Sequence, residues 1–240
     1  MIIEVCANSV ESALNAQKGG ADRIELCGEL EVGGVTPSYG VIALVREQLS
    51  IPVHVLIRPR SGNFTYTETE FEVMKRDIQF CKEIGCDGIV SGVLNADNTL
   101  DVERTKALVE LSGSLSFTFH RAFDWLPNPD EAIEQLIAMG CNRILTSGQK
   151  PKAEAGLGDL VKWNEKYGNQ IQLMPGSGVN AANIQTFKEK GFKEIHFSAS
   201  KLKKNLTTTP KISFNNHVFD ESYLRNTDLQ TVQTLVNLVK

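Results

Sequence analysis

The stretch GADRI at residues 20–24 recurs three times in this chain, as GCDGI at 85–89, GCNRI at 140–144 and GFKEI at 191–195. Each copy follows a helix-like stretch and begins a short β-branched run. The glycine suits the end of a helix, where the backbone turns left-handed, and the isoleucine suits a strand. Successive copies are separated by roughly the length of two strand–helix units. Such internal repetition predicts a fold assembled from similar units.

Four further strand-like runs lie between and before these copies, which makes eight short strands. Helical stretches separate the strands, and the clearest is 69–84, with apolar residues every three or four positions. Alternating strands and helices indicate a parallel sheet, and closing that sheet as a barrel leaves no exposed edge. We therefore predict an α/β fold, a TIM (β/α)8 barrel, with an open doubly wound sheet as the alternative. The predicted strands are residues 2–6, 23–27, 52–57, 88–91, 116–120, 143–146, 170–174 and 194–197.

The 240 residues suit one such barrel, so we expect a single domain over residues 1–240. After the eighth strand the pattern changes to a long, polar, irregular connection at 199–223, followed by an amphipathic helix at 227–239. Loops of this length serve as lids or interface elements, or are mobile. A scaffold that binds a partner through this loop is therefore one functional hypothesis.

The composition is that of an ordinary globular protein, with 41% hydrophobic and 22% charged residues. The net charge of −4 argues against non-specific binding to nucleic acid or to a membrane, because both reward basic patches. The chain has no apolar run of about 18 residues, and it begins directly with a strand pattern rather than a secretory signal. These features predict a cytoplasmic protein.

Two of the five cysteines, Cys6 and Cys27, lie at the ends of the first two predicted strands. None of the five forms a CxxC pair, so we expect free thiols. Because residues two apart share a face of a strand, Glu4 and Cys6 should point into the barrel, as should Glu25 and Cys27. Two thiolates on neighbouring strands suit a soft ion such as Cu(I). Packing as small buried hydrophobes is the alternative.

Segments suited to anions follow other predicted strands. Arg58 stands before a proline at the end of the third strand, where a fixed guanidinium could hold a carboxylate or phosphate. The seventh strand leads into the turn Gly176, Ser177 and Gly178, whose backbone amides and following helix favour an anion. Ser147 and Ser198 end strands six and eight and complete this predicted anion site, although a tight turn also needs glycine.

Acid–base chemistry is suggested by the fifth strand, which ends in His120 with Asp124 four residues later. A histidine at a barrel mouth with an aspartate four residues later suits either an acid–base group or a ligand. Glu25 or Asp124 would then exchange protons with His120. His196 on the eighth strand is a comparable candidate, whereas His54 begins its strand and is expected to be structural.

Several of these strand-end motifs occur together in a known family. The motifs are EVC at 4–6, GGADRIELC at 19–27, GGVTPS at 33–38, IRPR at 57–60, FHRAFD at 119–124, LTSG at 145–148 and MPGSG at 174–178. In combination, and over residues 1 to about 200, the chain resembles the CutC family, named for copper homeostasis. The resemblance implies a cytoplasmic TIM barrel that forms a homodimer or larger homo-oligomer. It also implies copper handling, with Cu(I) bound at the cysteines that correspond to Cys6 and Cys27.

Two main functions therefore compete. The first is a copper homeostasis protein that binds Cu(I) through Cys6 and Cys27. The second is an enzyme of the lyase, isomerase or aldolase type that acts on a small anionic or phosphorylated metabolite. In that hypothesis Arg58 and the turn at 176–178 hold the anion. The absence of a lysine at an inner strand end argues against Schiff-base chemistry.

Overall fold

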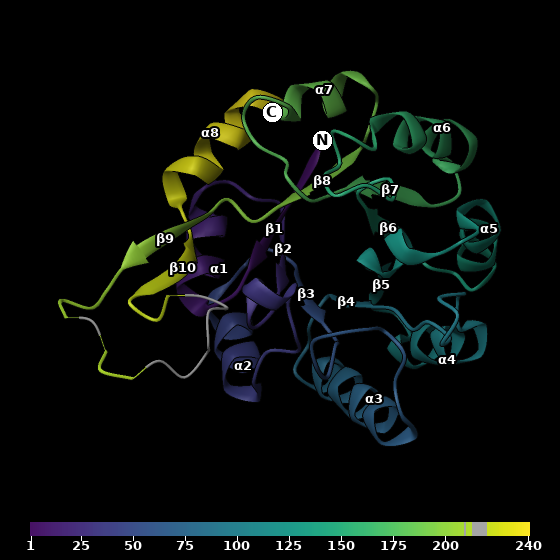
Figure 1. Cartoon of the computed structure of the whole chain (residues 1–240), viewed down its shortest axis with the longest axis horizontal. Helices are drawn as coiled ribbons and strands as arrows, with labels where there is room; N and C mark the ends of the chain where they lie inside the picture. Colours follow the sequence, from purple (N-terminus) through teal and green to yellow (C-terminus); the bar gives the residue numbers. More distant parts are fainter. Residues whose placement is uncertain (209, 213–219) are drawn as a thin grey trace.

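The computed structural model describes residues 1–208, 210–212 and 220–240, and it forms a barrel of parallel strands surrounded by helices (Figure 1). Eight parallel strands make one sheet in the order β7-β6-β5-β4-β3-β2-β1-β8. This arrangement confirms the predicted TIM barrel. The strands are β1 (Ile2–Ala7), β2 (Arg23–Leu26), β3 (Val53–Leu56), β4 (Gly88–Ser91), β5 (Ser116–Phe119), β6 (Arg143–Thr146), β7 (Gln172–Pro175) and β8 (Glu194–Phe197).

The helices form the outer ring (Figure 1). Local signals in the sequence begin several of them: the Ser9 side chain accepts from the Ser12 amide, and Thr67 forms a capping box with Glu70. The α-helices are α1 (Val10–Lys18), α2 (Tyr39–Gln48), α3 (Glu68–Glu83), α4 (Val102–Ser112), α5 (Pro129–Ala138), α6 (Leu157–Tyr167), α7 (Ile184–Glu189) and α8 (Leu229–Val239). Two short 3-10 helices, η1 (Leu30–Val32) and η2 (Arg121–Trp125), lie in loops after β2 and β5.

The repeated stretch has two structural roles. Its glycines, Gly20, Gly85, Gly140 and Gly191, all have φ between 74° and 92°, as the left-handed turn after a helix requires. The fourth residue of each copy begins one of the even-numbered strands and points into the barrel. Four residues from alternate strands therefore form one interior layer. They are Arg23, Gly88, Arg143 and Glu194.

This interior layer is charged rather than apolar. Arg23 donates to both Glu4 and Glu194, and Arg143 donates to Glu194 with a nitrogen–oxygen distance of 3.0 Å. The glycine of the layer makes room for a ring, because a Cβ on Gly88 would lie 2.4 Å from Cδ2 of His54. The outward residues of the same strands pack under the helices as the hydrophobic core.

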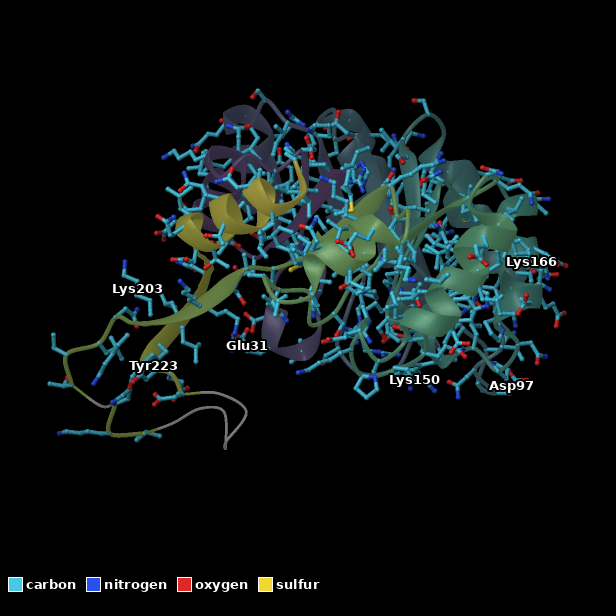
Figure 2. All side chains as sticks on the ribbon, turned by 90° about the horizontal axis from the view of Figure 1, so that it is seen from above. Glu31, Asp97, Lys150, Lys166, Lys203 and Tyr223 are labelled. Atoms are coloured by element: carbon cyan, nitrogen blue, oxygen red, sulfur yellow. The ribbon has the colours of Figure 1, made fainter. Side chains whose placement is uncertain are left out.

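The chain after β8 differs from the predicted irregular connection at 199–223. The start of that segment forms β9 (Ser200–Lys204), which pairs as an antiparallel hairpin with β10 (Tyr223–Thr227), a strand that begins at the segment's last residue. Figure 2 shows this hairpin, marked by Lys203 and Tyr223, extending away from the barrel. Cross-strand hydrogen bonding overrides the polar composition that indicated a loop. Residues 209 and 213–219 of the predicted loop lie outside the described residues.

The last helix packs on the first strand–helix unit. It begins at Leu229, after the N-cap Asp228, rather than at residue 227. A Cβ on Gly19 would lie 2.4 Å from Cγ1 of Val232, so the close approach of α8 to the end of α1 requires glycine there. Over the described residues, the structure contains no helix with the length and apolar character needed to cross a membrane.

Candidate functional site

A cavity of about 500 Å³ opens at the carboxyl ends of the strands, which is where TIM barrels place their functional groups. We call it the mouth cavity. Side chains of β1, β2, β3, β6 and β8 line it, together with residues of the loops after β2, β3, β5, β7 and β8. The polar side chains that line it are Cys6, Glu25, Arg58, His120, Arg121, Ser177, His196 and Ser198.

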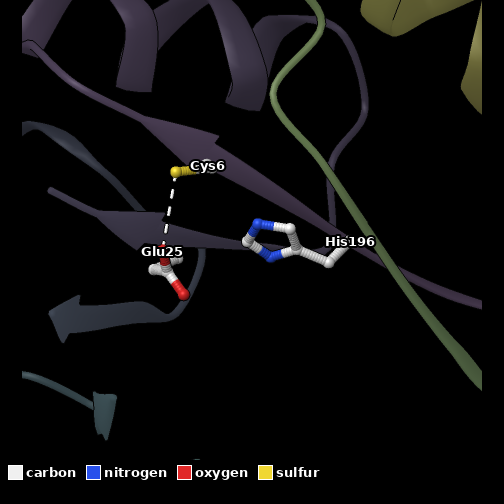
Figure 3. A group of neighbouring side chains, drawn as sticks. All are labelled: Cys6, Glu25 and His196. Atoms are coloured by element: carbon white, nitrogen blue, oxygen red, sulfur yellow. Dashed lines mark hydrogen bonds between the residues drawn. The ribbon is translucent and has the colours of Figure 1, made fainter. Parts of the chain in front are cut away.

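Three of these side chains converge at the inner end of the mouth cavity (Figure 3). One potential ligand atom each from Cys6, Glu25 and His196 lies within 4.8 Å of the other two, and all three residues are buried. The Cys6 thiol donates to Oε1 of Glu25 over 3.5 Å. A thiol, a carboxylate and an imidazole in this arrangement could hold a metal ion.

Cys27 lies directly behind Cys6. The two sulfur atoms are 3.5 Å apart, and both cysteines are free thiols. Cys27 is only 1% exposed and does not line the mouth cavity; it packs with Leu56 and Val90. The adjacency of the first two strands predicted this proximity, and in the structure only Cys6 of the two lines the cavity.

Buried charge surrounds this group. Glu4 is fully buried, which would raise its pKa, but Arg23 and His196 outweigh burial and hold that pKa well below its usual range. Burial raises the pKa of Glu25. Burial opposes the charged form of His196, yet the carboxylates of Glu25 and Glu4 raise its pKa. Burial also lowers the pKa of His54 to about 3, which keeps that ring neutral.

The Cys6 thiol is held in its protonated form. Its contact with Cys27 is the largest cause of a pKa raised well above the ordinary value, and burial adds to the effect. A metal ion that binds this sulfur must therefore displace a proton.

Arg58 lines the mouth cavity, but its guanidinium already has backbone partners. It donates to the carbonyl oxygens of Val32, Gly34 and Gly62 at 2.7 to 3.0 Å. Its side chain therefore ties the loop after β2 to the loop after β3. The anion contact predicted for Arg58 stays a prediction.

His120 is buried at the end of β5 and caps η2. Its Nδ1 accepts from the backbone amide of Ala122 at 3.2 Å, and its Nε2 has no partner among the described residues. Burial, with a smaller contribution from Arg58, lowers the pKa of His120 to about 3.

Asp124 does not line the mouth cavity. Its carboxylate accepts from the hydroxyl of Thr146, the amide and hydroxyl of Ser147, the amide of Gln149 and Nε of Arg121. These contacts fasten the loop after β6 to η2. The predicted proton exchange between Asp124 and His120, and the predicted role of Ser147 in anion binding, stay predictions.

The glycine turn after β7 lies at the edge of the mouth cavity. Ser177 and Gly178 have φ of 81° and 71°, and both line the cavity together with Ser198. Gly176 lies against β6 and β8, because a Cβ there would be 2.5 Å from Leu145. The Ser177 hydroxyl donates to the carbonyl of Pro151. An anion at this turn also stays a prediction.

The sequence did not indicate a role for Arg121, whose side chain lines the cavity, and it indicated His196 as an acid–base or ligand group without joining it to Cys6. A signal for His196 was present, because it shares an inward face with Glu194 on β8. The position of Arg121 could have indicated that it lines the site, because it directly follows His120 at the carboxyl end of a strand.

A family model described as the CutC family matches residues 1–201. The chain belongs to the CutC family. The CutC family protein of Xanthomonas campestris pv. campestris strain B100 is 48% identical over 200 residues, which cover 83% of this chain and 83% of that protein. The CutC family protein of Bacteroides thetaiotaomicron is 44% identical over 241 residues, with 99% of this chain and 96% of that protein covered.

A solved CutC structure is also similar. The Streptococcus agalactiae protein, to which copper homeostasis is provisionally assigned, has a TM-score of 0.79 at 36% identity, covering 82% of this chain and 98% of that chain. Thiamine phosphate pyrophosphorylase from Pyrococcus furiosus has a TM-score of 0.61 at 15% identity, covering 99% of this chain and 95% of that one, and shares the fold alone.

Proposed function

We propose that this CutC protein binds Cu(I) between Cys6, at the inner end of the mouth cavity, and Cys27 behind it, with the two thiolates as its principal ligands. The observation that carries the proposal is the 3.5 Å separation of the two sulfur atoms on neighbouring strands of a rigid barrel. Thiolate sulfur is the donor that Cu(I) prefers. Both thiols are free, which suits a reducing compartment, and we place this function in the cytoplasm.

The short sulfur–sulfur distance favours a bent site with a third ligand. A metal about 2.3 Å from each of two sulfurs that are this close together cannot lie on the line between them. It must sit to one side, where further donors can reach it. His196 and Glu25 lie on the cavity side of Cys6, within 4.8 Å of its sulfur.

His196 is the better third ligand. Its Nδ1 is 2.8 Å from Oε1 of Glu4, which leaves Nε2 available toward the cavity. Histidines that bind metals commonly donate their other ring nitrogen to a carboxylate, which fixes the ring and increases its basicity. The Glu4–His196 pair has that arrangement.

An anaerobic Cu(I) titration against a competing chelator tests the proposal. Changes to residues that only support metal ligands typically cost roughly 10- to 100-fold in metal affinity. Because the double variant Cys6→Ser, Cys27→Ser removes the ligands themselves, its Cu(I) affinity should fall by more than that. Cys141→Ser is the matched control, because Cys141 is also a buried free thiol but lies in the outer core. A double variant that binds as tightly as the Cys141→Ser protein would refute the ligand assignment.

The predicted homodimer or larger homo-oligomer stays a prediction. Sedimentation of the purified protein measures it directly.

A further inference from the structure

The mouth cavity is larger than an ion requires. Its volume of about 500 Å³ is lined by Cys6 and also by Phe64 and Trp125, which lie in the loops after β3 and β5. Cavities of this size that combine apolar walls with a few fixed polar groups are typical of small-molecule sites. Two of its polar groups, His120 and Arg121, retain hydrogen-bonding capacity that the fold does not use.

His120 presents a donor of known identity. The Ala122 amide can only donate, so Nδ1 of His120 must carry a lone pair, and in the neutral ring the proton therefore resides on Nε2. The residue is 5% exposed, it lines the cavity, and Nε2 has no partner among the described residues. A buried donor without an acceptor is costly, and a ligand oxygen would relieve that cost.

Arg121 presents a fixed cation beside it. Nε donates to Asp124 at 2.8 Å and Nη2 to the Ser147 hydroxyl at 2.9 Å. These bonds orient the guanidinium, and among the described residues Nη1 has no partner. The side chain is 42% exposed and lines the cavity. The Asp124 carboxylate also accepts hydrogen bonds from Thr146, Ser147 and Gln149, so it neutralises the Arg121 guanidinium only in part. The guanidinium can therefore still attract an anion.

Apolar and aromatic side chains also line the cavity beside these two groups. The ring of Phe64 lies 4.8 Å from the ring of His120 and 4.9 Å from that of Trp125. Leu30 and Val32 line the same cavity. A ligand here would gain affinity by placing an apolar body against these side chains.

We propose that the mouth cavity binds a small 2-oxo carboxylate with a compact apolar body, whose ketone oxygen accepts from Nε2 of His120 and whose carboxylate pairs with Arg121. Both side chains line the same cavity, and a 2-oxo acid carries an acceptor oxygen and an anionic group in one small molecule. A single negative charge fits better than a phosphate dianion, because Glu25 lines the same cavity and the Nη atoms of Arg58 donate to backbone carbonyls, which leaves Arg121, among the described residues that line the cavity, as the cation with a free Nη donor. This site is separate from the copper proposal and does not rest on it.

The test is calorimetric titration of the full chain with two probes that differ only in the ketone oxygen, 4-methyl-2-oxopentanoate and 4-methylpentanoate. We expect the oxo acid to bind about tenfold more tightly, which is the effect of one hydrogen bond to a buried donor. Inorganic phosphate, used as a competitor, should displace the oxo acid poorly. Equal affinities for the two acids, no binding of the oxo acid at 10 mM, or displacement by phosphate at matched concentration would each overturn the proposal.

Two variants locate the binding groups. In His120→Asn the side-chain oxygen can still cap η2, but the donor at Nε2 is lost, so the preference for the oxo acid should disappear while both acids still bind. Arg121→Met should weaken both acids by a similar factor, whereas Arg76→Met, a change to an 81% exposed arginine on α3, should weaken neither. Retention of the oxo preference in His120→Asn would refute the role of His120. Cys6→Ser should leave the oxo preference intact, which separates this site from copper binding.

Discussion

Glu4 on β1 and His196 on β8 form a buried pair, with Oε1 of Glu4 2.8 Å from Nδ1 of His196. The strands are neighbours, and their register places Glu4 opposite His196. Through Glu4 the histidine is connected to Arg23 and the interior charged layer. The candidate metal site is therefore in direct contact with the buried ion pairs inside the barrel.

The first prediction concerns Glu4, which neutralises both Arg23 and His196. Glu4→Gln leaves those cations without their common partner and should lower the free energy of unfolding by about 3–5 kcal/mol. Urea denaturation measures this loss. Glu110→Gln on the surface of α4, where the ion pair with Lys106 is exposed, should change stability by less than about 1 kcal/mol. Equal effects of the two substitutions would contradict the assigned role of Glu4.

The second prediction is that Cu(I) affinity rises with pH. The pKa of Cys6 is raised well above its ordinary value by its contact with Cys27 and by burial, so at neutral pH a metal displaces a proton from this sulfur. Each displaced proton makes the apparent affinity increase about tenfold per pH unit. Chelator competition between pH 6 and pH 8 measures the slope. A flat profile would mean that Cys6 does not bind the metal as a thiolate.

The third prediction is a loss of stability as the pH falls below about 6.5. His54 and His120 are buried and neutral, and burial lowers the pKa of each to about 3. Between pH 6.5 and pH 3 the unfolded chain binds protons that the folded chain does not, so the stability present above this window declines through it. Each histidine contributes up to about 1.4 kcal/mol per pH unit.

Denaturation midpoints at several pH values measure this dependence. His120→Phe removes one titrating group and keeps a ring of similar size, so its pH dependence should be shallower than that of the parent protein. His196 has the opposite effect on the pH dependence of stability. Because its pKa is raised in the folded protein, it adds stability at low pH, and that stability is lost as the pH rises through the raised pKa. An identical pH profile in His120→Phe would show that the buried imidazole is not the source of the effect.

The fourth prediction concerns Gly88, which occupies the small position of the charged layer. In Gly88→Ala the new Cβ would lie 2.4 Å from Cδ2 and 2.6 Å from Nε2 of His54, so the ring must move. We expect a loss of about 1–3 kcal/mol, as in other overpacked interiors, measured by thermal or urea denaturation.

Gly158→Ala is the matched control for this change. Gly158 lies in α6 and nothing approaches its Cβ position within 4 Å, so alanine there should be neutral or stabilising by up to about 1 kcal/mol. If Gly88→Ala were as stable as Gly158→Ala, the packing of His54 against β4 would not matter for the fold.

The sequence by itself determined the barrel, because its information is local and repetitive. Residues 20–24 and the three related stretches carry both the turn glycine and the strand start, and the two-residue period of a strand is enough to send Glu4, Cys6, Glu25 and Cys27 inward. The hairpin of β9 and β10 was not predictable in the same way. Its partner strands are separated by a long polar segment, and pairing depends on cross-strand hydrogen bonds that composition does not reveal.

Tertiary structure alone decided which inward residues share a site. His196 joins Cys6 and Glu25 because β8 lies beside β1 in the barrel, although His196 and Cys6 are far apart in the sequence. It also decided which polar atoms are already occupied: both Nη atoms of Arg58 donate to backbone carbonyls, whereas its Nε and Nε2 of His120 have no partner among the described residues. A strand's period fixes the face on which a side chain lies. The atoms that meet that side chain depend on neighbours brought together by the closure of the sheet.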